Sequence, residues 1–386
     1  MAKKKSEPSP TPAPAPGLQM QAHRHGLLAA CRLVSAAIPV GSAKPVLRNI
    51  KAIANGDRCT LMATDLEIAV RLDVRGIRVS QPGHALLPSA RLLAILSETL
   101  DEDLHIVTGD HITVRGSTNE FEMPADDPAT FPDVPSFDEK SYHEITANML
   151  REMIRRTVFA TANDNVRFGA TTGVLWELSE KQATLVATDG RRLAVMSAPA
   201  KAVNGHATKA ADVPVVPAKA MTLLARLLTN PDETVRVAFR KNEVFIQVGE
   251  TVIYSRLVEG RFPDYKQVIP KDGMQSANLV AGPLNTAIRQ ASIMAEDDGC
   301  VDLRFAKQRL SVKAQGAESG KSNVELPVDY AGKESNVAFN PSYVTEMLRV
   351  LEPDASMTLD MNGDRPALFK TPNYQYVVVP LVESKS

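Results

Sequence analysis

The chain has 386 residues and a formal net charge of −1, from 44 basic and 45 acidic side chains. Apolar residues make up 44% of it, a globular composition that excludes disordered, collagen-like and disulfide-rich chains. At about 150 residues per domain, this length predicts two or three domains. The balanced charge lacks the excess of Lys and Arg that marks a nucleic-acid-binding protein.

Cysteine content and hydropathy indicate the compartment. Cys31, Cys59 and Cys300 lie far apart and form no Cys-x-x-Cys motif, so we expect free thiols and no zinc site. No uninterrupted run of about 18 apolar residues and no apolar leader occurs. We therefore expect a cytoplasmic protein without a membrane-spanning helix.

The first 21 residues differ from the rest of the chain. Lys3–Lys5 precede a stretch with proline at every second position from 8 to 16. Alternating Pro and Ala favour an extended, unpaired backbone. We expect residues 1–21 to form a flexible tail, whose lysines either contact phosphate or only aid solubility.

The remaining residues contain three copies of one pattern. Ala63–Val70 resembles Ala187–Val195, 124 positions later, and Phe131-Pro132-Asp133 recurs 131 positions later. A third motif, Leu87–Leu93, recurs in all three copies, as Val216–Leu224 and Phe339–Val344. The repeats predict three domains, over residues 22–142, 143–272 and 273–386.

Each copy shows the same order of elements. A helical segment comes first, strands with alternating hydrophobicity follow, a second helix begins at a proline, and further strands close the copy. This order predicts an α+β fold, with two helices on antiparallel sheets per copy, and not a doubly wound parallel sheet. The first helices are predicted at residues 27–38, 149–159 and 284–294, and the second helices from Pro88, Pro217 and Pro341.

Charge is segregated between the predicted helices and the rest of the chain. Their sum is +5, which leaves −6 for all other residues. In the helix from Asn148, Arg151 and Arg155 lie opposite an apolar stripe, as on a solvated face or on a face that binds an anion. The basic residues are Arg32, Arg91, Arg151, Arg155, Arg156, Lys219, Arg226, Arg289 and Arg349, and the acidic ones are Glu98, Glu152, Glu346 and Glu352.

One segment resembles a nucleotide-binding loop. Residues 316–322 read Gly-Ala-Glu-Ser-Gly-Lys-Ser, one residue short of the phosphate-loop motif. A phosphate loop must open a helix, whereas strand-like residues follow here. We therefore expect a hairpin loop, and a nucleotide-dependent enzyme remains a distant alternative.

No other motif predicts catalysis. The acidic pairs Asp126-Asp127 and Asp297-Asp298, and the pair His23 and His25, lack further ligands at metal-binding spacing. The motifs G-x-S-x-G, H-E-x-x-H and G-x-G-x-x-G do not occur. The sequence predicts no active site, cofactor or metal.

Long motifs in the middle copy resemble the β subunit of bacterial DNA polymerase III, the sliding clamp family. They are Ala187–Val195, Ser255–Tyr265 and Val268-Ile269-Pro270, supported by Lys44–Leu47, Ala63–Glu67, Phe339–Tyr343 and Tyr376–Pro380. The resemblance covers residues 22–382 in colinear order. It implies a non-catalytic processivity factor, a head-to-tail homodimeric ring around duplex DNA that tethers DNA polymerase III, the clamp loader, repair polymerases, ligase and mismatch-repair proteins.

The resemblance also implies functional residues. DNA would contact Lys44, Arg167 and Phe168 in loops, and Arg32, Arg151, Arg155, Lys219, Arg226 and Arg289 on helices. A hydrophobic cleft for partner peptides would contain Thr188, Gly190, Arg191, Arg192, Leu193, Pro263, Val268, Asn340, Tyr343, Pro366, Val377, Val379, Pro380 and Leu381. The ring interface would contain Phe121, Met123, Ile293 and Met294.

Three departures from the family pattern affect the cleft. Val379 and Leu381 replace methionines on either side of Pro380, Arg191 stands where His is frequent, and residues 167–173 carry one extra residue. At the ring interface, Glu120 stands where some relatives have a basic residue. The altered C-terminus, together with the extra N-terminal tail, keeps open the alternative of a clamp paralogue that serves a specialised polymerase or drug tolerance.

Overall fold

The computed structural model describes residues 17–39, 41, 43–163, 169–209, 213–271, 274–296, 299–316 and 318–381. Two compact units are present: Met1–Phe137 with Glu250–Tyr254, and Asp138–Gly249 with Ser255–Ser386. Among the helices of the described residues, none is long and apolar enough to cross a membrane.

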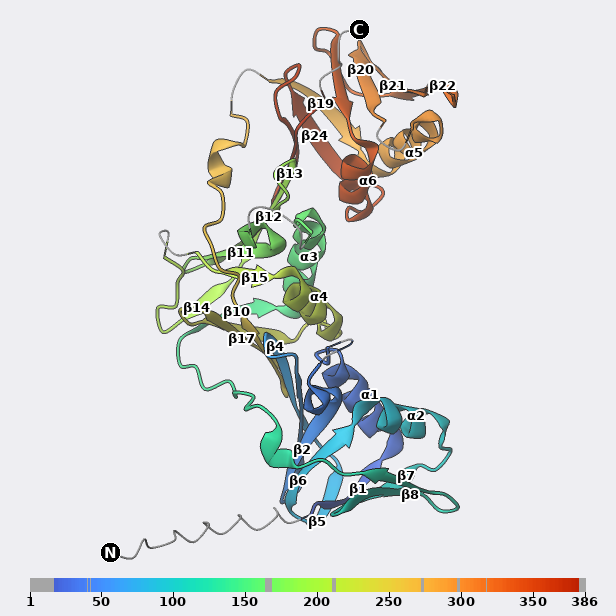
Figure 1. Cartoon of the computed structure of the whole chain (residues 1–386). Helices are drawn as coiled ribbons and strands as arrows, with labels where there is room; N and C mark the ends of the chain where they lie inside the picture. The colour runs from blue at the N-terminus through green and yellow to red at the C-terminus, as the bar shows by residue number, and fades with distance from the viewer. Residues whose placement is uncertain are drawn as a thin grey trace, which may run out of the picture. The chain divides into compact units, whose positions relative to one another are not determined.

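The first unit holds two antiparallel sheets and two helices that pack against each other (Figure 1). The strand orders are β5-β1-β7-β8-β9 and β18-β4-β3-β2-β6. The elements are β1 (Gln19–His23), α1 (Arg24–Ser35), β2 (Asn49–Asn55), β3 (Arg58–Thr64), β4 (Ile68–Val74), β5 (Ile77–Gln81), β6 (Gly83–Pro88), α2 (Ser89–Glu98), β7 (Asp103–Thr108), β8 (His111–Arg115), β9 (Glu120–Pro124) and β18 (Thr251–Arg256).

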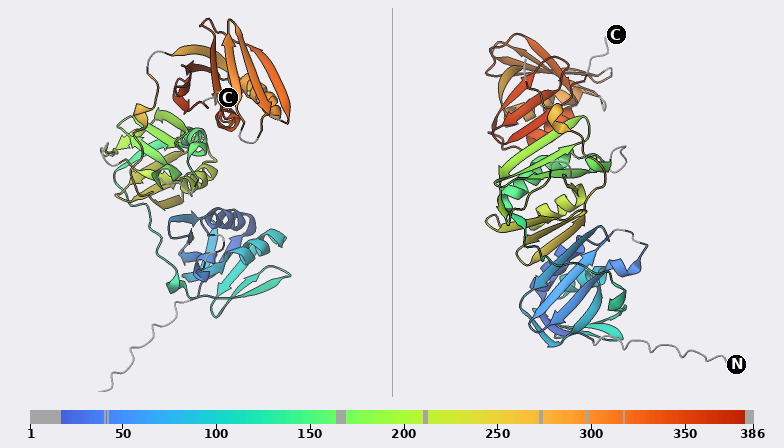
Figure 2. Two further views of the ribbon diagram at one scale, coloured as in Figure 1. Left: turned by 45° about the horizontal axis from the view of Figure 1, so that its top comes forward. Right: turned by 90° about the vertical axis from the view of Figure 1, so that its left-hand side faces the viewer.

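The second unit holds two copies of this arrangement, with a long sheet that contains strands of both. Its order is β15-β11-β12-β13-β26-β25-β24-β19, beside β14-β10-β16-β17 and β22-β21-β20-β23. Figure 2 shows the green strands of the middle copy continuing into the red strands of the third. The elements are β10 (Tyr142–Thr146), α3 (Ala147–Thr157), β11 (Gly173–Leu178), β12 (Gln182–Thr188), β13 (Arg192–Pro199), β14 (Lys201–Val203), β15 (Val215–Pro217), α4 (Ala218–Leu227), β16 (Thr234–Phe239), β17 (Glu243–Val248), β19 (Gln275–Val280), α5 (Ala281–Ala291), β20 (Val301–Ala306), β21 (Arg309–Gly316), β22 (Gly320–Pro327), β23 (Ser335–Phe339), α6 (Pro341–Arg349), β24 (Ser356–Met361), β25 (Ala367–Thr371) and β26 (Tyr374–Val378).

The predicted α+β order of each copy is confirmed, with two corrections. Pro341 occupies the first turn of α6, but Pro88 and Pro217 are the last residues of β6 and β15 and the N-cap residues of α2 and α4. The predicted tail is too long, because β1 begins at Gln19 and both Leu18 and Met20 are buried. Residues 1–16 lie outside the described residues.

Helix α3 shows why these segments become helices. Leu150, Met153 and Ile154 are fully buried at helical spacing, while Arg151 and Arg155 face solvent on the opposite side. Apolar burial on one stripe therefore fixes the helix on its sheet and leaves a charged face outward.

A pair of histidines lies in the middle copy. The Nδ1 atoms of His143 and His206 are 2.7 Å apart, and His143 is completely buried. His143 Nε2 lies 2.7 Å from the Ser179 carbonyl, and the Phe239 N–H donates to His206 Nε2. His143 must then carry its hydrogen on Nε2 and His206 on Nδ1, so both rings are neutral. Burial lowers the pKa of both, and His143 beside it helps lower the pKa of His206 to about 4.

Candidate functional site

A tight turn between β12 and β13 forms one wall of the predicted cleft. Thr188 Oγ1 donates to the Arg192 carbonyl (2.6 Å) and accepts from the Gly190 N–H (3.1 Å). Asp189 Oδ1 accepts from the N–H groups of Arg191 and Arg192. Gly190 takes φ = +89°, a conformation that glycine adopts without strain.

The first copy contains the same turn. Thr64 Oγ1 donates to the Ile68 carbonyl and accepts from the N–H of Leu66, while Asp65 Oδ1 accepts from the next two N–H groups. Leu66 takes φ = +81°, where the second copy has Gly190. The repeat found in the sequence is therefore a repeat of hydrogen bonding.

Arg192 holds this turn against the third copy. Its guanidinium bonds Asp189 Oδ2 (2.9 Å), Glu346 Oε2 (2.6 Å) on α6 and the Phe159 carbonyl (2.9 Å). The guanidinium also lies 4.7 Å from the ring centre of Tyr343. The side chain is only 9% exposed. Two carboxylates already neutralise it, so Arg192 is a structural cross-link and Arg191 is the exposed arginine of the turn.

Strands β13 and β26 form an apolar floor beside the turn. They pair antiparallel with Leu193 opposite Val377. Beyond β26, the Val379 N–H donates to the Arg191 carbonyl (2.9 Å) and the Leu381 N–H to the Ala338 carbonyl (2.8 Å). The buried members of the floor are Leu175, Val186, Leu193, Val195, Val215, Tyr265, Leu368 and Val377.

Exposed apolar side chains distinguish this region from an ordinary core. Val268 is 51% exposed, Val379 45% and Leu381 40%. A ligand that covers these aliphatic groups removes apolar surface from water, which favours binding.

The other predicted cleft residues are spread over several segments. Asn340 caps α6 by accepting from the Ser342 N–H, and the carbonyl of Tyr343 accepts from Tyr376 Oη. Pro263 is exposed and Pro380 is buried, while Pro366 stands one residue before β25.

The sequence alone missed the polar end of this surface. A cavity of about 480 Å³ is lined there by Leu175, Glu177 and Tyr265 among others. Tyr265 Oη donates to Glu177 Oε2 (2.9 Å), and Lys266 Nζ lies 2.9 Å from Glu177 Oε1. Burial, together with the charge of Glu177, raises the pKa of Tyr265, which keeps its hydroxyl a donor.

Most basic residues predicted to face DNA are exposed. On the helices these are Arg32, Arg151, Lys219, Arg226 and Arg289, and Lys44 is exposed before a short 3-10 helix at Pro45–Arg48. The observed helix bounds include Arg24 and exclude Glu352, so the six helices carry ten basic and three acidic residues.

Arg155 differs from the other basic residues. It bonds Glu152 twice, at 2.8 and 2.9 Å, and lies 3.4 Å from Glu352. Two carboxylates therefore offset its charge. Arg167 and Phe168 lie outside the described residues.

Comparison with known proteins finds matches over nearly the whole length of the chain. Family models of the DNA polymerase III beta subunit match in chain order: the N-terminal domain at residues 18–135, the central domain at 144–264 and the C-terminal domain at 266–382. A beta sliding clamp of Pseudomonas putida is 30% identical over 376 residues, covering 93% of this chain and 98% of the relative. That of Escherichia coli K12 is 28% identical over 334 residues, with 85% and 89% coverage.

The chain belongs to the DNA polymerase III beta subunit family.

Solved structures agree with this membership. The sliding clamp of Pseudomonas aeruginosa bound to griselimycin has a TM-score of 0.87 at 26% identity, covering 95% of this chain and all of that one. The Bacillus subtilis clamp has a TM-score of 0.89 at 24% identity, with the same coverage, and so supports the fold. The three-domain fold is therefore confirmed, and the function is that of a DNA sliding clamp, a non-catalytic processivity factor.

The residues predicted for the clamp's ring interface fall on two exposed edges. Phe121 is 37% exposed on β9, the last strand of its sheet, whereas Met123 is buried. Ile293 is 72% exposed, and Met294 follows it in a 3-10 turn beside the edge strand β22.

The predicted hairpin at residues 316–322 is confirmed. Strands β21 and β22 pair antiparallel up to Gly316 opposite Gly320, and a strand follows the loop where a phosphate loop needs a helix.

Asp126 accepts from Asn49 Nδ2, and Asp127 caps a 3-10 turn. Asp297 and Asp298 lie outside the described residues. The described residues contain no group of three metal-ligating side chains.

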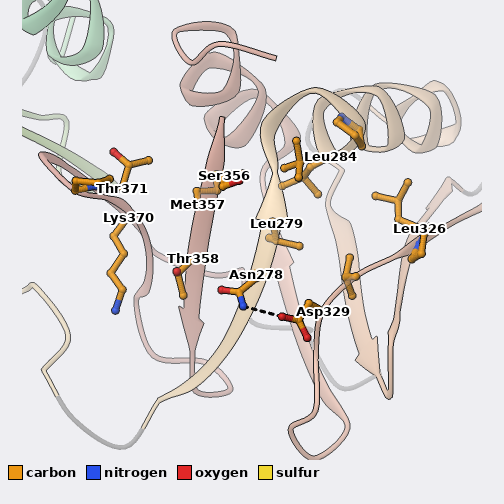
Figure 3. A pocket seen from close by; sticks show the side chains of 15 residues that line it. Asn278, Leu279, Leu284, Leu326, Asp329, Ser356, Met357, Thr358, Lys370 and Thr371 are labelled. Carbon is orange, nitrogen blue, oxygen red and sulfur yellow. Dashed lines mark hydrogen bonds between the residues drawn. The ribbon is translucent and has the colours of Figure 1, made fainter. Parts of the chain in front are cut away.

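The third copy also contains a cavity of about 760 Å³ between β19, β24 and the start of α5 (Figure 3). Asn278 Nδ2 donates to Asp329 Oδ2 at its edge (3.0 Å). None of the predicted site residues lines it.

Proposed function

We propose that two copies of this chain close into a ring around duplex DNA and hold partner proteins through the cleft at β13 and β26. The observation that carries the proposal is the exposure of Val268, Val379 and Leu381 at a buried apolar floor in a member of the clamp family. A short apolar peptide is the ligand that such a surface fits. DNA polymerase III, its clamp loader and repair enzymes are the proposed partners.

The basic helices supply the DNA contact. Arg151, Lys219, Arg226 and Arg289 are exposed, and long basic side chains reach phosphates without reading bases. Sequence-independent contact suits a protein that must slide.

Edge strands supply the ring interface. Strand β9 with Phe121 and strand β22 beside Ile293 each end a sheet and present unpaired backbone groups. Pairing of β9 of one copy with β22 of another satisfies both edges and closes a head-to-tail dimer.

Loading on circular DNA tests the ring. The protein is loaded by its clamp loader onto nicked circles, the salt is raised to about 1 M, and one half of the sample is linearised. A topological ring stays on closed circles and leaves the linear DNA, whereas phosphate binding falls steeply with salt on both. Loss from intact circles at high salt would contradict the proposal.

A further inference from the structure

A basic cavity of about 910 Å³ lies beside the cleft in the middle copy. It is lined by residues 206–209, 213–215, 239–243 and 256–260. Four of these residues are cations and two are anions: Lys209, Arg240, Lys241 and Arg256, and Glu243 and Glu259. Cations therefore outnumber anions along this lining, and Glu139, which lies outside it, is paired with Arg240.

Among the described residues, two of these cations have no carboxylate partner. Arg240 is bonded to Glu139 (2.7 Å) and stacks 4.5 Å above the ring of Phe245. Lys209 and Lys241 are exposed, and no ion pair among the described residues includes them. These two ammonium groups are therefore available to an incoming anion.

The basic cavity is continuous with the cleft floor. It shares Val213 and Gly260 with the cavity at Tyr265, and Val215 belongs to the buried floor itself. The Val258 N–H donates to the Val215 carbonyl (2.8 Å), which fixes the chain between the two cavities. Because the two cavities share these lining residues, a peptide extension that leaves the floor enters the basic cavity, with about 3.3 Å of length per extended residue.

We propose that an acidic segment flanking a cleft-bound partner peptide binds in this basic cavity, on Lys209 and Lys241. The inference rests on the proposed function, because the cleft must first hold the peptide. The segment is extended and carries two or more Asp or Glu residues. Its contribution falls with ionic strength, because both lysines are at the surface.

Fluorescent peptides separate the two contacts. The core peptide carries Leu and Phe anchors, and its binding must be lost in Val268→Glu, which alters the cleft at an exposed position. Further peptides add four Asp residues, or four Asn residues as a neutral control, to either end. One acidic extension is expected to tighten binding about fivefold at 50 mM salt and to lose that gain at 500 mM.

Matched variants locate the effect. In Lys209→Gln/Lys241→Gln the gain from the acidic extension disappears and binding of the core peptide is unchanged. In Lys307→Gln/Lys333→Gln, which removes two exposed lysines of the third copy, the gain remains. A gain that persists in the first variant, or no gain from either acidic extension, overturns the inference. A core peptide that binds Val268→Glu normally refutes the cleft instead.

Discussion

Arg192 shows how one buried side chain can hold together the segments that border a proposed binding site. A buried guanidinium is costly unless carboxylates and carbonyls replace its water, and Asp189, Glu346 and the Phe159 carbonyl do so here. The cross-link joins β13 to α6 and therefore holds together the two copies that border the proposed cleft. Its neighbour Arg191 has the opposite character, since its backbone is fixed by Val379 and its side chain is exposed.

Replacing each arginine by alanine is expected to separate these roles. Arg192→Ala leaves two carboxylates without their cation and lowers the free energy of unfolding by about 3–5 kcal/mol. Arg191→Ala changes it by less than about 0.5 kcal/mol, because the side chain is at the surface. Urea unfolding of the second unit measures both changes in the free energy of unfolding. Equal losses in the two variants would contradict the assigned roles of Arg192 and Arg191.

At the scale of elements, exposed basic side chains on the helices differ in how far neighbouring carboxylates offset their positive charge. Arg151 and Arg155 lie one turn apart on α3, but Glu152 and Glu352 offset the charge of Arg155. Arg151→Ala is therefore expected to weaken DNA binding and to reduce the salt slope by about one phosphate contact, and Arg155→Ala to do less. DNA affinity measured across a salt series compares the matched pair. An Arg155→Ala effect as large as that of Arg151→Ala would refute this reading.

The pair of His143 and His206 makes the middle copy sensitive to acid. The folded pKa of both lies below the value of an unfolded histidine, so the unfolded chain binds protons first as the pH falls. The folded state is therefore most stable above about pH 6.5 and loses stability as the pH falls toward 4. Glu139 raises the pKa of His206 and softens the effect. We expect a loss of about 1–2 kcal/mol between pH 7 and 4.5, with solvent screening included.

Urea unfolding at several pH values measures this slope. His206→Leu is expected to flatten it, and His105→Gln, at an exposed position, to leave it unchanged. A slope that survives in His206→Leu would show that carboxylates alone cause the acid sensitivity. Nitrogen NMR checks the two assigned tautomers directly.

The sequence predicts what is local or repeated and misses what joins distant residues. Periodicity found α3, and the repeat marked Ala63–Val70 and Ala187–Val195 as equivalent segments, which the structure shows to form the same turn. The partner of Arg192 is 154 positions away at Glu346, and no pattern in the sequence links them. The sequence pattern places Pro88 and Pro217 at the start of helices, because proline suits both a first helical turn and the residue before it. Tyr265 lay inside a recognised motif, but its bond to Glu177 depends on tertiary packing.

At the scale of the whole molecule, the proposed ring interface includes exposed apolar side chains. Ile293 is 72% exposed, so Ile293→Asp is expected to fold normally and to weaken the dimer at least about tenfold, as burying an isoleucine contributes about 1.5–3 kcal/mol. Val280→Asp is the control, because Val280 is 41% exposed and caps α5, where Asp is favourable. Sedimentation equilibrium compares both with the parent chain. An unchanged dimer in Ile293→Asp would contradict the proposed interface.

The pairing of β13 with β26 has a consequence for synthesis on the ribosome. Strand β13 ends at Pro199 and its partner starts at Tyr374. At 5–20 residues per second, roughly 10–40 s pass before the partner emerges. During that time β13 is an open sheet edge, and Leu193 and Val195 lack their buried neighbours Leu368 and Val377. Such an edge is a template for pairing with a neighbouring nascent chain. Chains translated close together on one messenger are therefore exposed to misassembly at the same strand that later borders the proposed cleft.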